Sequence, residues 1–387
     1  MKIEVINIGS ELIDGTRVNR NLSCIAEKLK GLDCEITRGI IVGDDEKEIL
    51  EVLNDSFRRV KMIIITGGLG PTLDDVTKKA ITKFFNRRMV VDNNNQALVP
   101  QASRILPNPK GTAPGLILEE KDKMLVALPG VPEELNYLLE EALIPYLKQK
   151  VRLSSMARRT FKIYGLTEVE LSEKIRLILK RKGLRFSILP RQIEIALKIE
   201  AGGNEAVNLI QGAEEEIKRN LGDTIYGMEE ETLEEVVGLL LSMEKKKISV
   251  AESCTAGLIS HRLTNVAGSS QYFEGGVIVY SNKGKMDLLG LDEKLLKEQG
   301  AVSEETARAM AVGVKNLTGV DLGLAVTGIA GPGGEMTDKP IGLTFIALAK
   351  SKKTVVQKFQ FQGERELIKL KASQAALNMV RLSLIKK

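Results

Sequence analysis

Polar side chains follow two apolar segments in the C-terminal third of the chain. Ser253 comes directly after KISVAE, and Tyr280 ends the segment GGVIVY, five residues before Lys285. Ligands of open α/β sheets usually bind where strands end, so these side chains can share one crevice. A serine hydroxyl becomes an effective nucleophile when a neighbouring base takes its proton. The pattern therefore indicates a hydrolytic site with Ser253 as its nucleophile.

The chain offers few bases for such a serine. Its single histidine, His261, lies eight residues after Ser253 on the same predicted helix. That spacing is about 12 Å along the helix axis, too far for a direct hydrogen bond. A lysine can take the proton when burial favours its neutral amine, and a tyrosine hydroxyl can relay it. Lys285 with Tyr280 fits this role best, and spacing leaves Lys283 as the competing lysine.

Two other interpretations apply to the segment around Ser253. Ser253 or Thr255 can merely cap the helix that is predicted to follow, because either hydroxyl can accept from free backbone N–H groups. Cys254 is intrinsically more nucleophilic than serine, and the start of a helix would lower its pKa. The local sequence leaves both alternatives open beside the serine nucleophile.

Hydrolysis of an amide also requires hydrogen-bond donors for the developing oxyanion. The turn AVTGIAGPGG, residues 325–334, can present backbone N–H groups after a predicted strand, or it can be a plain hairpin loop before IGLTFIALA. Arg365 begins the last predicted helix, where a guanidinium and free N–H groups can hold a phosphate.

A glycine-rich loop and two acidic residues follow a buried strand in the first third of the chain. The segment KMIIITGGLGPTLDD places Gly67, Gly68 and Gly70 before Asp74 and Asp75. Glycines let the backbone approach phosphate oxygens, and carboxylates beside a phosphate call for a divalent cation between them. Alternatively, both acids only complement a helix dipole. Other loop residues that can contact the same ligand are Gly9, Glu11, Thr66, Pro71, Thr72, Asn108, Gly111, Thr112 and Gly130.

These side chains require a scaffold of three domains. Residues 1–150 alternate short apolar runs with amphipathic segments, which predicts a parallel α/β domain. Residues 151–228 follow the order strand, helix, two strands, helix, strand, which is typical of a small split βαβ fold. Residues 229–387 alternate strands and helices again. We therefore expect two three-layer α/β domains joined by a small α+β domain that acts as a spacer or interface module.

The composition is that of a soluble globular protein. The net charge of +5 is spread along the 387 residues, and the chain has no Trp and only 4% aromatic residues, which leaves little for stacking on nucleic-acid bases. Cys24, Cys34 and Cys254 form neither a CxxC pair nor a regular framework, which favours a reducing cytoplasm. No run reaches the ~18 apolar residues of a membrane span. We therefore expect a cytoplasmic protein without nucleic-acid or membrane partners.

Four segments of the last third resemble the C-terminal domain of the CinA family: AESCTAG, AGSSQYFEGGVIVYSN, GAVSE and TGIAGPGG. This resemblance implies a nicotinamide mononucleotide deamidase that releases nicotinate mononucleotide and ammonia, needs no metal in this domain, and forms a homodimer. It implies that Ser253, Tyr280 and Lys285 are catalytic and that Thr327 and Gly328 belong to the substrate and oxyanion loop. The other expected substrate-binding residues are Thr255, Asn282, Ala330, Gly331 and Arg365.

The N-terminal motifs are similar to the CinA N-terminal domain and, more distantly, to domains that bind molybdopterin. The resemblance implies an ADP-ribose pyrophosphatase that uses Mg, Mn or Co, with the glycine loop on the diphosphate and Asp74 or Asp75 near the metal. The stretch between Thr77 and QALVPQAS is shorter than the family pattern and predicts the loss of a strand and a helix there. One alternative is that the N-terminal half binds a pterin or nucleotide without turnover beside a working amidase; another is that the whole chain is an adaptor that recruits recombination proteins.

Overall fold

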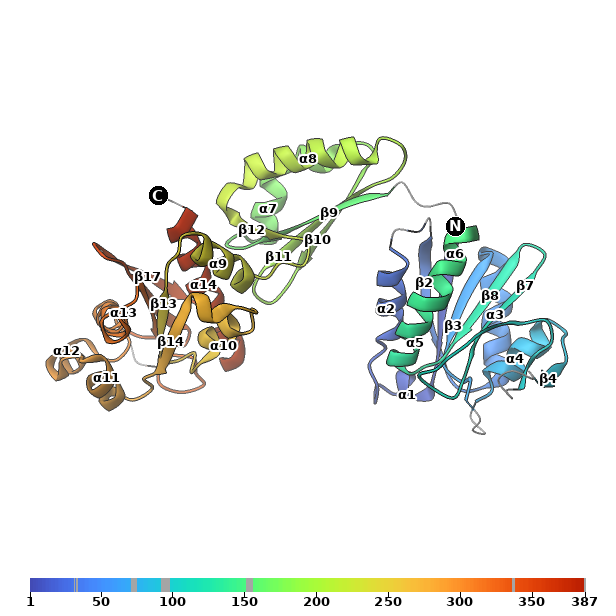
Figure 1. The fold of residues 1–387 in the computed structure, drawn as a ribbon, viewed down its shortest axis with the longest axis horizontal. Coiled ribbons are helices and arrows are strands. Elements are labelled where there is room, and N and C mark those ends of the chain that lie inside the picture. Colours follow the sequence, from blue (N-terminus) through green and yellow to red (C-terminus); the bar gives the residue numbers. More distant parts are fainter. Residues whose placement is uncertain are drawn as a thin grey trace. The chain divides into compact units, whose positions relative to one another are not determined.

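The computed structural model describes residues 1–30, 32, 34–70, 75–91, 98–150, 156–335 and 338–385. The chain divides into two compact units, one of Met1–Met156 with Gly202–Asn204 and one of Ala157–Ala201 with Glu205–Lys387 (Figure 1). Two three-layer α/β domains and a small α+β domain make up these units, so the predicted fold class is confirmed.

A six-stranded sheet forms the centre of the first unit, with the order β2-β1-β3-β8-β7-β6. Its strands are β1 (Lys2–Ile8), β2 (Glu35–Val42), β3 (Met62–Thr66), β6 (Arg104–Leu106), β7 (Gly115–Glu120) and β8 (Lys123–Leu128). The sheet is parallel, as predicted, except at one edge, where β7 runs antiparallel to both of its neighbours, β8 and β6. Only two residues connect β7 to β8, and so short a turn can join only antiparallel strands.

Helices cover both faces of this sheet. One face packs against α2 (Asn21–Lys28), α5 (Pro132–Leu138), a π-helical turn (Leu139–Leu143) and α6 (Ile144–Lys150). The other face packs against α3 (Glu46–Arg59) and α4 (Thr77–Phe84). The short helix α1 (Ser10–Ile13) and the paired strands β4 (Met89–Val91) and β5 (Leu98–Pro100) complete the domain.

The middle domain is an antiparallel sheet with helices on one face. Its strands have the order β10-β11-β9-β12. The elements are β9 (Ala157–Ile163), α7 (Glu168–Lys174), a 3-10 turn (Ile178–Lys180), β10 (Leu184–Pro190), β11 (Ile195–Ala201), α8 (Ala206–Leu221) and β12 (Ile225–Met228). Ile210, Ala213 and Ile217 of α8 bury one side of that helix against Leu197 and Ile199 of β11.

The C-terminal domain contains a five-stranded sheet with the order β14-β13-β15-β16-β17. The strands are β13 (Ile248–Glu252), β14 (Phe273–Ile278), β15 (Leu322–Gly328), β16 (Leu343–Ala349) and β17 (Thr354–Gln360). On one face lie α9 (Leu233–Met243), α10 (Leu258–Thr264) and α14 (Arg365–Ile385). On the other lie α11 (Asn282–Leu289), α12 (Glu293–Gln299) and α13 (Glu304–Thr318). The first three strands are parallel, so their carboxyl ends meet at one edge.

Buried contacts join the middle domain to the C-terminal domain. Tyr226 of β12 belongs to the C-terminal core, and Tyr164 packs against that core. Arg381 of α14 is 4% exposed and donates hydrogen bonds to the carbonyl oxygens of Ile225 (3.3 Å) and Asp223. These contacts fix the small domain on its larger neighbour.

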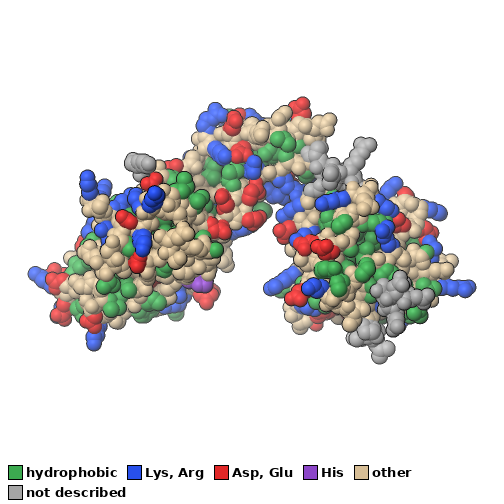
Figure 2. Space-filling view, in the orientation of Figure 1, with side chains coloured by type: hydrophobic (Ala, Val, Ile, Leu, Met, Phe, Trp, Pro, Cys, Tyr) green, Lys and Arg blue, Asp and Glu red, His purple; other side chains and the backbone are tan. Residues whose placement is uncertain are grey.

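Charged side chains of both signs are interspersed over the face shown in Figure 2, in line with the small net charge of +5. Within the part of the chain that the structure describes, no helix is long and apolar enough to cross a membrane.

Candidate active site

Ser253 and Lys285 meet at the carboxyl edge of the C-terminal sheet. Ser253 follows β13 directly, and the chain leaves the neighbouring strand β14 at Ile278 to enter α11, which carries Lys285. Ser281 caps α11 by accepting a hydrogen bond from the Gly284 N–H at 3.0 Å. The Nζ of Lys285 lies 3.2 Å from the Oγ of Ser253 and forms a hydrogen bond with it. The two strand ends therefore share one crevice.

Lys285 is fully buried, and this burial lowers its pKa below the ordinary lysine value. Its Nζ also contacts the carbonyl oxygens of Val279 (2.9 Å) and Tyr280 (3.2 Å). Among the described residues, no carboxylate forms an ion pair with it that would restore the charged form. A lysine in such a place gives up its proton more readily than one in water. The competing Lys283 is exposed, and the lysine that contacts Ser253 is Lys285.

The turn after Ser253 is held by Glu252, a residue that the sequence analysis passed over. The helix expected from Thr255 begins only at Leu258, with Gly257 as its N-cap. The Glu252 carboxylate is fully buried and accepts from the N–H groups of Gly257 (2.9 Å), Ile259 (3.1 Å) and Ser260 (2.8 Å) and from the Ser260 hydroxyl (2.7 Å). The capping interpretation of Ser253 and Thr255 is therefore wrong. An acidic residue within the apolar strand 248–252 was the available signal.

The two other potential reactive groups of this segment are unsuited to the chemistry. Cys254 is 5% exposed, and burial raises the pKa of its thiol to about 12, so it holds its proton at neutral pH. His261 is exposed, and its ring Nε2 lies 3.3 Å from the amide nitrogen of Asn265. Neither side chain competes with Ser253 and Lys285.

Tyr280 and Arg365 bond to each other at the edge of the crevice. The Tyr280 hydroxyl, whose residue is 60% exposed, accepts from Nη2 of Arg365 at 3.0 Å. Nη1 of Arg365 donates to the Gly331 carbonyl. Arg365 thus links the start of α14 to the end of β14 and to the loop after β15. The backbone carbonyl of Tyr280 accepts a hydrogen bond from Lys285. The hydroxyl of Tyr280 contacts Arg365 and neither Ser253 nor Lys285.

The remaining predicted residues of this domain shape the loop after β15. The Thr327 hydroxyl is buried and donates to the Ala301 carbonyl at 2.7 Å. A Cβ at Gly328 would lie 2.7 Å from the Leu343 carbonyl oxygen, so a side chain there would clash with β16. Ala330 is part of the hydrophobic core, Asn282 is the exposed first residue of α11, and the Thr255 hydroxyl is buried without a hydrogen-bond partner within the described residues.

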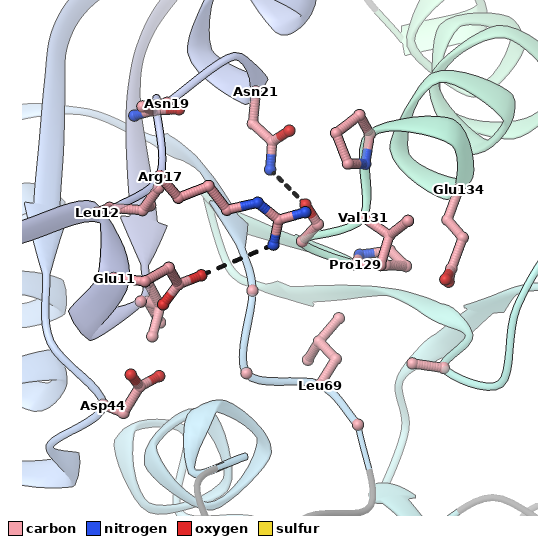
Figure 3. A pocket seen from close by; sticks show the side chains of 18 of the residues that line it. Glu11, Leu12, Arg17, Asn19, Asn21, Asp44, Leu69, Pro129, Val131 and Glu134 are labelled. Atoms are coloured by element: carbon pink, nitrogen blue, oxygen red, sulfur yellow. Dashed lines mark hydrogen bonds and ion pairs between the residues drawn. The ribbon is translucent and has the colours of Figure 1, made fainter. Parts of the chain in front are cut away.

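The first unit contains a separate cavity of about 600 Å³ (Figure 3). It lies beyond the carboxyl ends of β1 and β3. Eight of the predicted nucleotide or metal residues line it: Gly9, Glu11, Gly67, Gly68, Gly70, Asp75, Thr112 and Gly130. Pro71, Thr72 and Asp74 lie outside the described residues.

The glycine loop presents bare backbone to this cavity. Gly67 and Gly68 have φ values of +97° and +64°, which side chains rarely adopt. A Cβ on Gly67 would lie 2.3 Å from the Ile8 carbonyl oxygen, and one on Gly68 would lie 2.2 Å from the Thr77 hydroxyl. Only glycine fits at either position.

Three predicted residues lie behind the cavity wall. The Thr66 hydroxyl is buried and donates to the Asn7 side chain at 3.3 Å. Asn108 donates to the Glu134 carboxylate at 2.6 Å, and a Cβ on Gly111 would lie 2.1 Å from that carboxylate. Asn108 and Gly111 therefore position Glu134, which does line the cavity.

Charged residues that the sequence analysis missed also line this cavity. Arg17 extends across it, 3.9 Å from Glu11, with Asp44 on the same side and Glu134 on the other (Figure 3). Asp44 follows the end of β2, a position that could have suggested it. Among the described residues, no group of three or more His, Cys, Asp or Glu side chains is arranged to hold a metal ion.

The segment after the acidic residues was expected to lack a strand and a helix. Residues 77–91 of that stretch form α4 and β4, and the shortening relative to the family pattern stays a prediction. Residues 92–97 lie outside the described residues.

Comparisons with known proteins assign each part of the chain. The family model described as the CinA C-terminal domain matches residues 230–384. The model of a probable molybdopterin binding domain matches residues 4–149, and that of the damage-inducible protein CinA KH domain matches residues 158–227.

Relatives match over the whole length. A putative competence-damage inducible protein of Clostridium beijerinckii is 38% identical over 411 residues, and one of Caldicellulosiruptor bescii is 40% identical over 410 residues; each match covers 100% of both chains. The crystal structure of competence/damage inducible protein CihA from Agrobacterium tumefaciens is 36% identical and covers 39% of this chain and 93% of that one, with a TM-score of 0.38. By its full-length similarity to these relatives, the chain belongs to the CinA family.

Proposed function

We propose that the C-terminal domain hydrolyses the carboxamide of nicotinamide mononucleotide, yielding nicotinate mononucleotide and ammonia for pyridine nucleotide recycling. The observation that carries this proposal is the buried contact of 3.2 Å between Lys285 Nζ and Ser253 Oγ. Burial lowers the pKa of this lysine, which is the condition for an amine to act as a base near neutral pH.

The reaction follows from this pair. The neutral Lys285 amine takes the Ser253 proton while Oγ attacks the carboxamide carbon, and the protonated amine then gives this proton to the amide nitrogen, which leaves as ammonia when the C–N bond breaks. Lys285 next takes a proton from water while the water oxygen attacks the acyl-serine, and it returns this proton to Ser253 Oγ as the acyl–oxygen bond breaks and the acid leaves. Backbone N–H groups of the loop after Gly328 stabilise the oxyanion. Arg365 holds the phosphate. Tyr280, whose hydroxyl accepts a hydrogen bond from Arg365, lies at the edge of the crevice.

Ammonia release from nicotinamide mononucleotide tests this proposal. Ser253→Ala and Lys285→Ala are expected to lose activity by at least about 10³-fold, as enzymes do when a nucleophile or its base is removed. Cys254→Ala and Lys283→Ala serve as matched neighbours and should retain nearly full activity. Retention of activity by Ser253→Ala would refute the proposal.

We also propose that the first unit is a metal-dependent ADP-ribose pyrophosphatase. The bare glycine loop and the cavity beside Asp75 support it. Mg²⁺ is commonly held by one or two carboxylates together with substrate phosphates, so the donor set at Asp75 fits Mg, Mn or Co. Such an ion would neutralise the diphosphate, while Arg17 and the glycine N–H groups orient it.

AMP release from ADP-ribose with Mg²⁺, Mn²⁺ or Co²⁺ distinguishes this enzyme from a module that only binds its ligand. Asp75→Asn is expected to lower the rate at least about tenfold, because the loss of a charge-assisted contact costs about 1.5–3 kcal/mol. Binding of ADP-ribose by the unmodified chain without any AMP release would favour the non-catalytic module.

The proposed partners of the chain are nicotinamide mononucleotide, ADP-ribose and a second copy of the chain. The sequence of the middle domain is relevant to a further class of partner, nucleic acid. Domains of the KH type clamp nucleic acid with a G-x-x-G loop. Residues 157–228 contain no G-x-x-G sequence. Chromatography with light scattering would measure the proposed homodimer.

A further inference from the structure

Asn21 is a nearly buried residue in the wall of the first-unit cavity, and one end of its carboxamide has no partner. It is the first residue of α2, lines the cavity and is 8% exposed. Its Nδ2 donates to the Gly130 carbonyl at 2.9 Å (Figure 3). Among the described residues, none donates a hydrogen bond to its Oδ1. Because nearly buried polar atoms are almost always paired, this open acceptor indicates a partner from outside the chain.

The Gly130 carbonyl fixes which end of the carboxamide is open. A carbonyl oxygen only accepts hydrogen bonds, so the amide nitrogen of Asn21 must face Gly130, and its Oδ1 is left for a ligand. An acceptor at this place selects a ligand group that donates, such as a hydroxyl or an amine. It does not suit the oxygens of an ionised phosphate, which themselves only accept.

Gly130 also connects Asn21 to the glycine loop. A Cβ on Gly130 would lie 3.3 Å from the Cα of Gly67, so the two glycine backbones are in contact, and both line the same cavity. Asn21 therefore lies beside the loop that is proposed above to hold the diphosphate. In a nucleotide the pentose follows the phosphate directly, and the base lies beyond the pentose. A pentose hydroxyl is the first donor that a ligand on this loop brings near Asn21.

We propose that Oδ1 of Asn21 accepts a hydrogen bond from a hydroxyl of the pentose that carries the phosphate, so that the first unit selects ribose over deoxyribose. This inference rests on the proposed pyrophosphatase function and adds a specificity-determining residue to it. ADP-ribose has a ribose on each side of its diphosphate, and hydrolysis leaves one in AMP and the other in ribose 5-phosphate. Both sugars have the same donor chemistry, and the two products tell them apart.

Calorimetric titration with these two products tests the inference without turnover. The full-length chain with Mg²⁺ is titrated with AMP, with ribose 5-phosphate, and with the deoxy forms of each that lack the 2- or the 3-hydroxyl. For one product, one deoxy form should bind about fivefold more weakly, the effect of a neutral hydrogen bond of about 1 kcal/mol. In Asn21→Ala that difference should vanish. The lost bond to Gly130 affects both ligands alike and cancels from the comparison.

Asn7→Ala is the matched control. Asn7 is a fully buried asparagine of β1 outside the cavity lining. Its Nδ2 donates to the Ile40 carbonyl at 3.2 Å, as that of Asn21 does to Gly130, but its Oδ1 accepts from the Thr66 hydroxyl at 3.3 Å. Both ends of this carboxamide are thus paired within the chain. Asn7→Ala should keep the fivefold difference, and loss of the difference in both variants would overturn the inference.

The titration and the AMP-release assay can fail independently. If Asn21→Ala abolishes the difference although the unmodified chain releases no AMP from ADP-ribose, the Asn21 assignment stands and the pyrophosphatase proposal fails. If AMP is released but no deoxy form binds more weakly than its parent, the Asn21 assignment is wrong. This comparison of ligands on the unmodified chain needs no substitution, so it decides the question even if a variant does not fold. Absence of binding by all of these ligands would also overturn the assignment.

Discussion

Lys285 combines full burial with three oxygen contacts, namely the Ser253 hydroxyl and two backbone carbonyls. Burial lowers its pKa from the ordinary 10.5. In the pH window between the lowered value and 10.5, the unfolded chain binds more protons than the folded one. The free energy of unfolding therefore rises with pH across that window, and the contribution of Lys285 is lost as pH falls through it.

The same titration predicts the pH dependence of the proposed deamidation. Activity requires the neutral amine, so kcat/KM should rise with pH through the lowered pKa of Lys285 and level off below 10.5. Initial rates of ammonia release over a pH series measure it. Cys254→Ala should give the same profile, and a rate that does not vary with pH would contradict this assignment of the base.

We expect Glu252 to position the proposed nucleophile, since its carboxylate accepts four hydrogen bonds from the turn and from α10. Glu252→Gln places an amide N–H₂ against backbone donors. We expect about 1.5–3 kcal/mol lower stability, the value of hydrogen bonds to a charged group, and a lower kcat with little change in KM. Urea unfolding and steady-state kinetics measure both.

Glu274→Gln provides the comparison for Glu252→Gln. Glu274 lies on β14 with its side chain 42% exposed and pairs with Lys247. Its loss should change the free energy of unfolding by less than about 1 kcal/mol and leave kcat unchanged. If the two variants had the same kcat, Glu252 would have no positioning role.

At the scale of elements, the N-terminus of α11 sets the position of Lys285. Ser281→Ala removes the cap of this helix, which should cost about 1 kcal/mol and lower kcat for ammonia release. Asp292→Ala removes the cap of α12 in the same domain at a similar cost in stability. Thermal unfolding should shift alike in both variants, and only Ser281→Ala should lose activity. Equal activities would show that the cap does not position Lys285.

The strands and the crevice were predictable because they depend on local patterns. Apolar runs marked β13, β14 and β15, and parallel strands bring their carboxyl ends together, which placed Ser253 near Lys285. The start of α10 was not predictable from capping rules, since Glu252 reaches forward from the preceding strand to the helix N–H groups. The antiparallel edge of the first sheet depends on the length of a turn that the sequence analysis did not weigh.

Contacts between residues far apart in the chain were the least predictable from the sequence. Tyr280 and Arg365 are 85 positions apart and hydrogen-bond at 3.0 Å. Asn21 and Gly130 are 109 positions apart and hydrogen-bond at 2.9 Å. No periodicity or motif in these segments predicts such contacts, because they depend on how whole elements and domains pack.

At the scale of the molecule, the middle and C-terminal domains act as one unit joined through Arg381. Arg381→Ala should lower the free energy of unfolding by about 1.5–3 kcal/mol, since it removes the hydrogen bonds of a charged, nearly buried guanidinium to two backbone carbonyls. Amide hydrogen exchange in residues 184–201 should become faster.

Arg308→Ala is the comparison for this change. Arg308 lies on α13 and bonds to Thr354 and Glu304, both in the C-terminal domain. It should leave exchange in the middle domain unaltered. If exchange in residues 184–201 were equally slow in both variants, Arg381 would not couple the two domains.

The enclosure of Cys254 has a consequence for oxidative stress. Peroxides and electrophiles attack thiolates, and this sulfur stays protonated and shielded beside an oxygen nucleophile. Amidases that rely on a reactive cysteine are silenced when cells accumulate peroxide. A crevice built on Ser253 and Lys285 would keep nucleotide turnover running under those conditions.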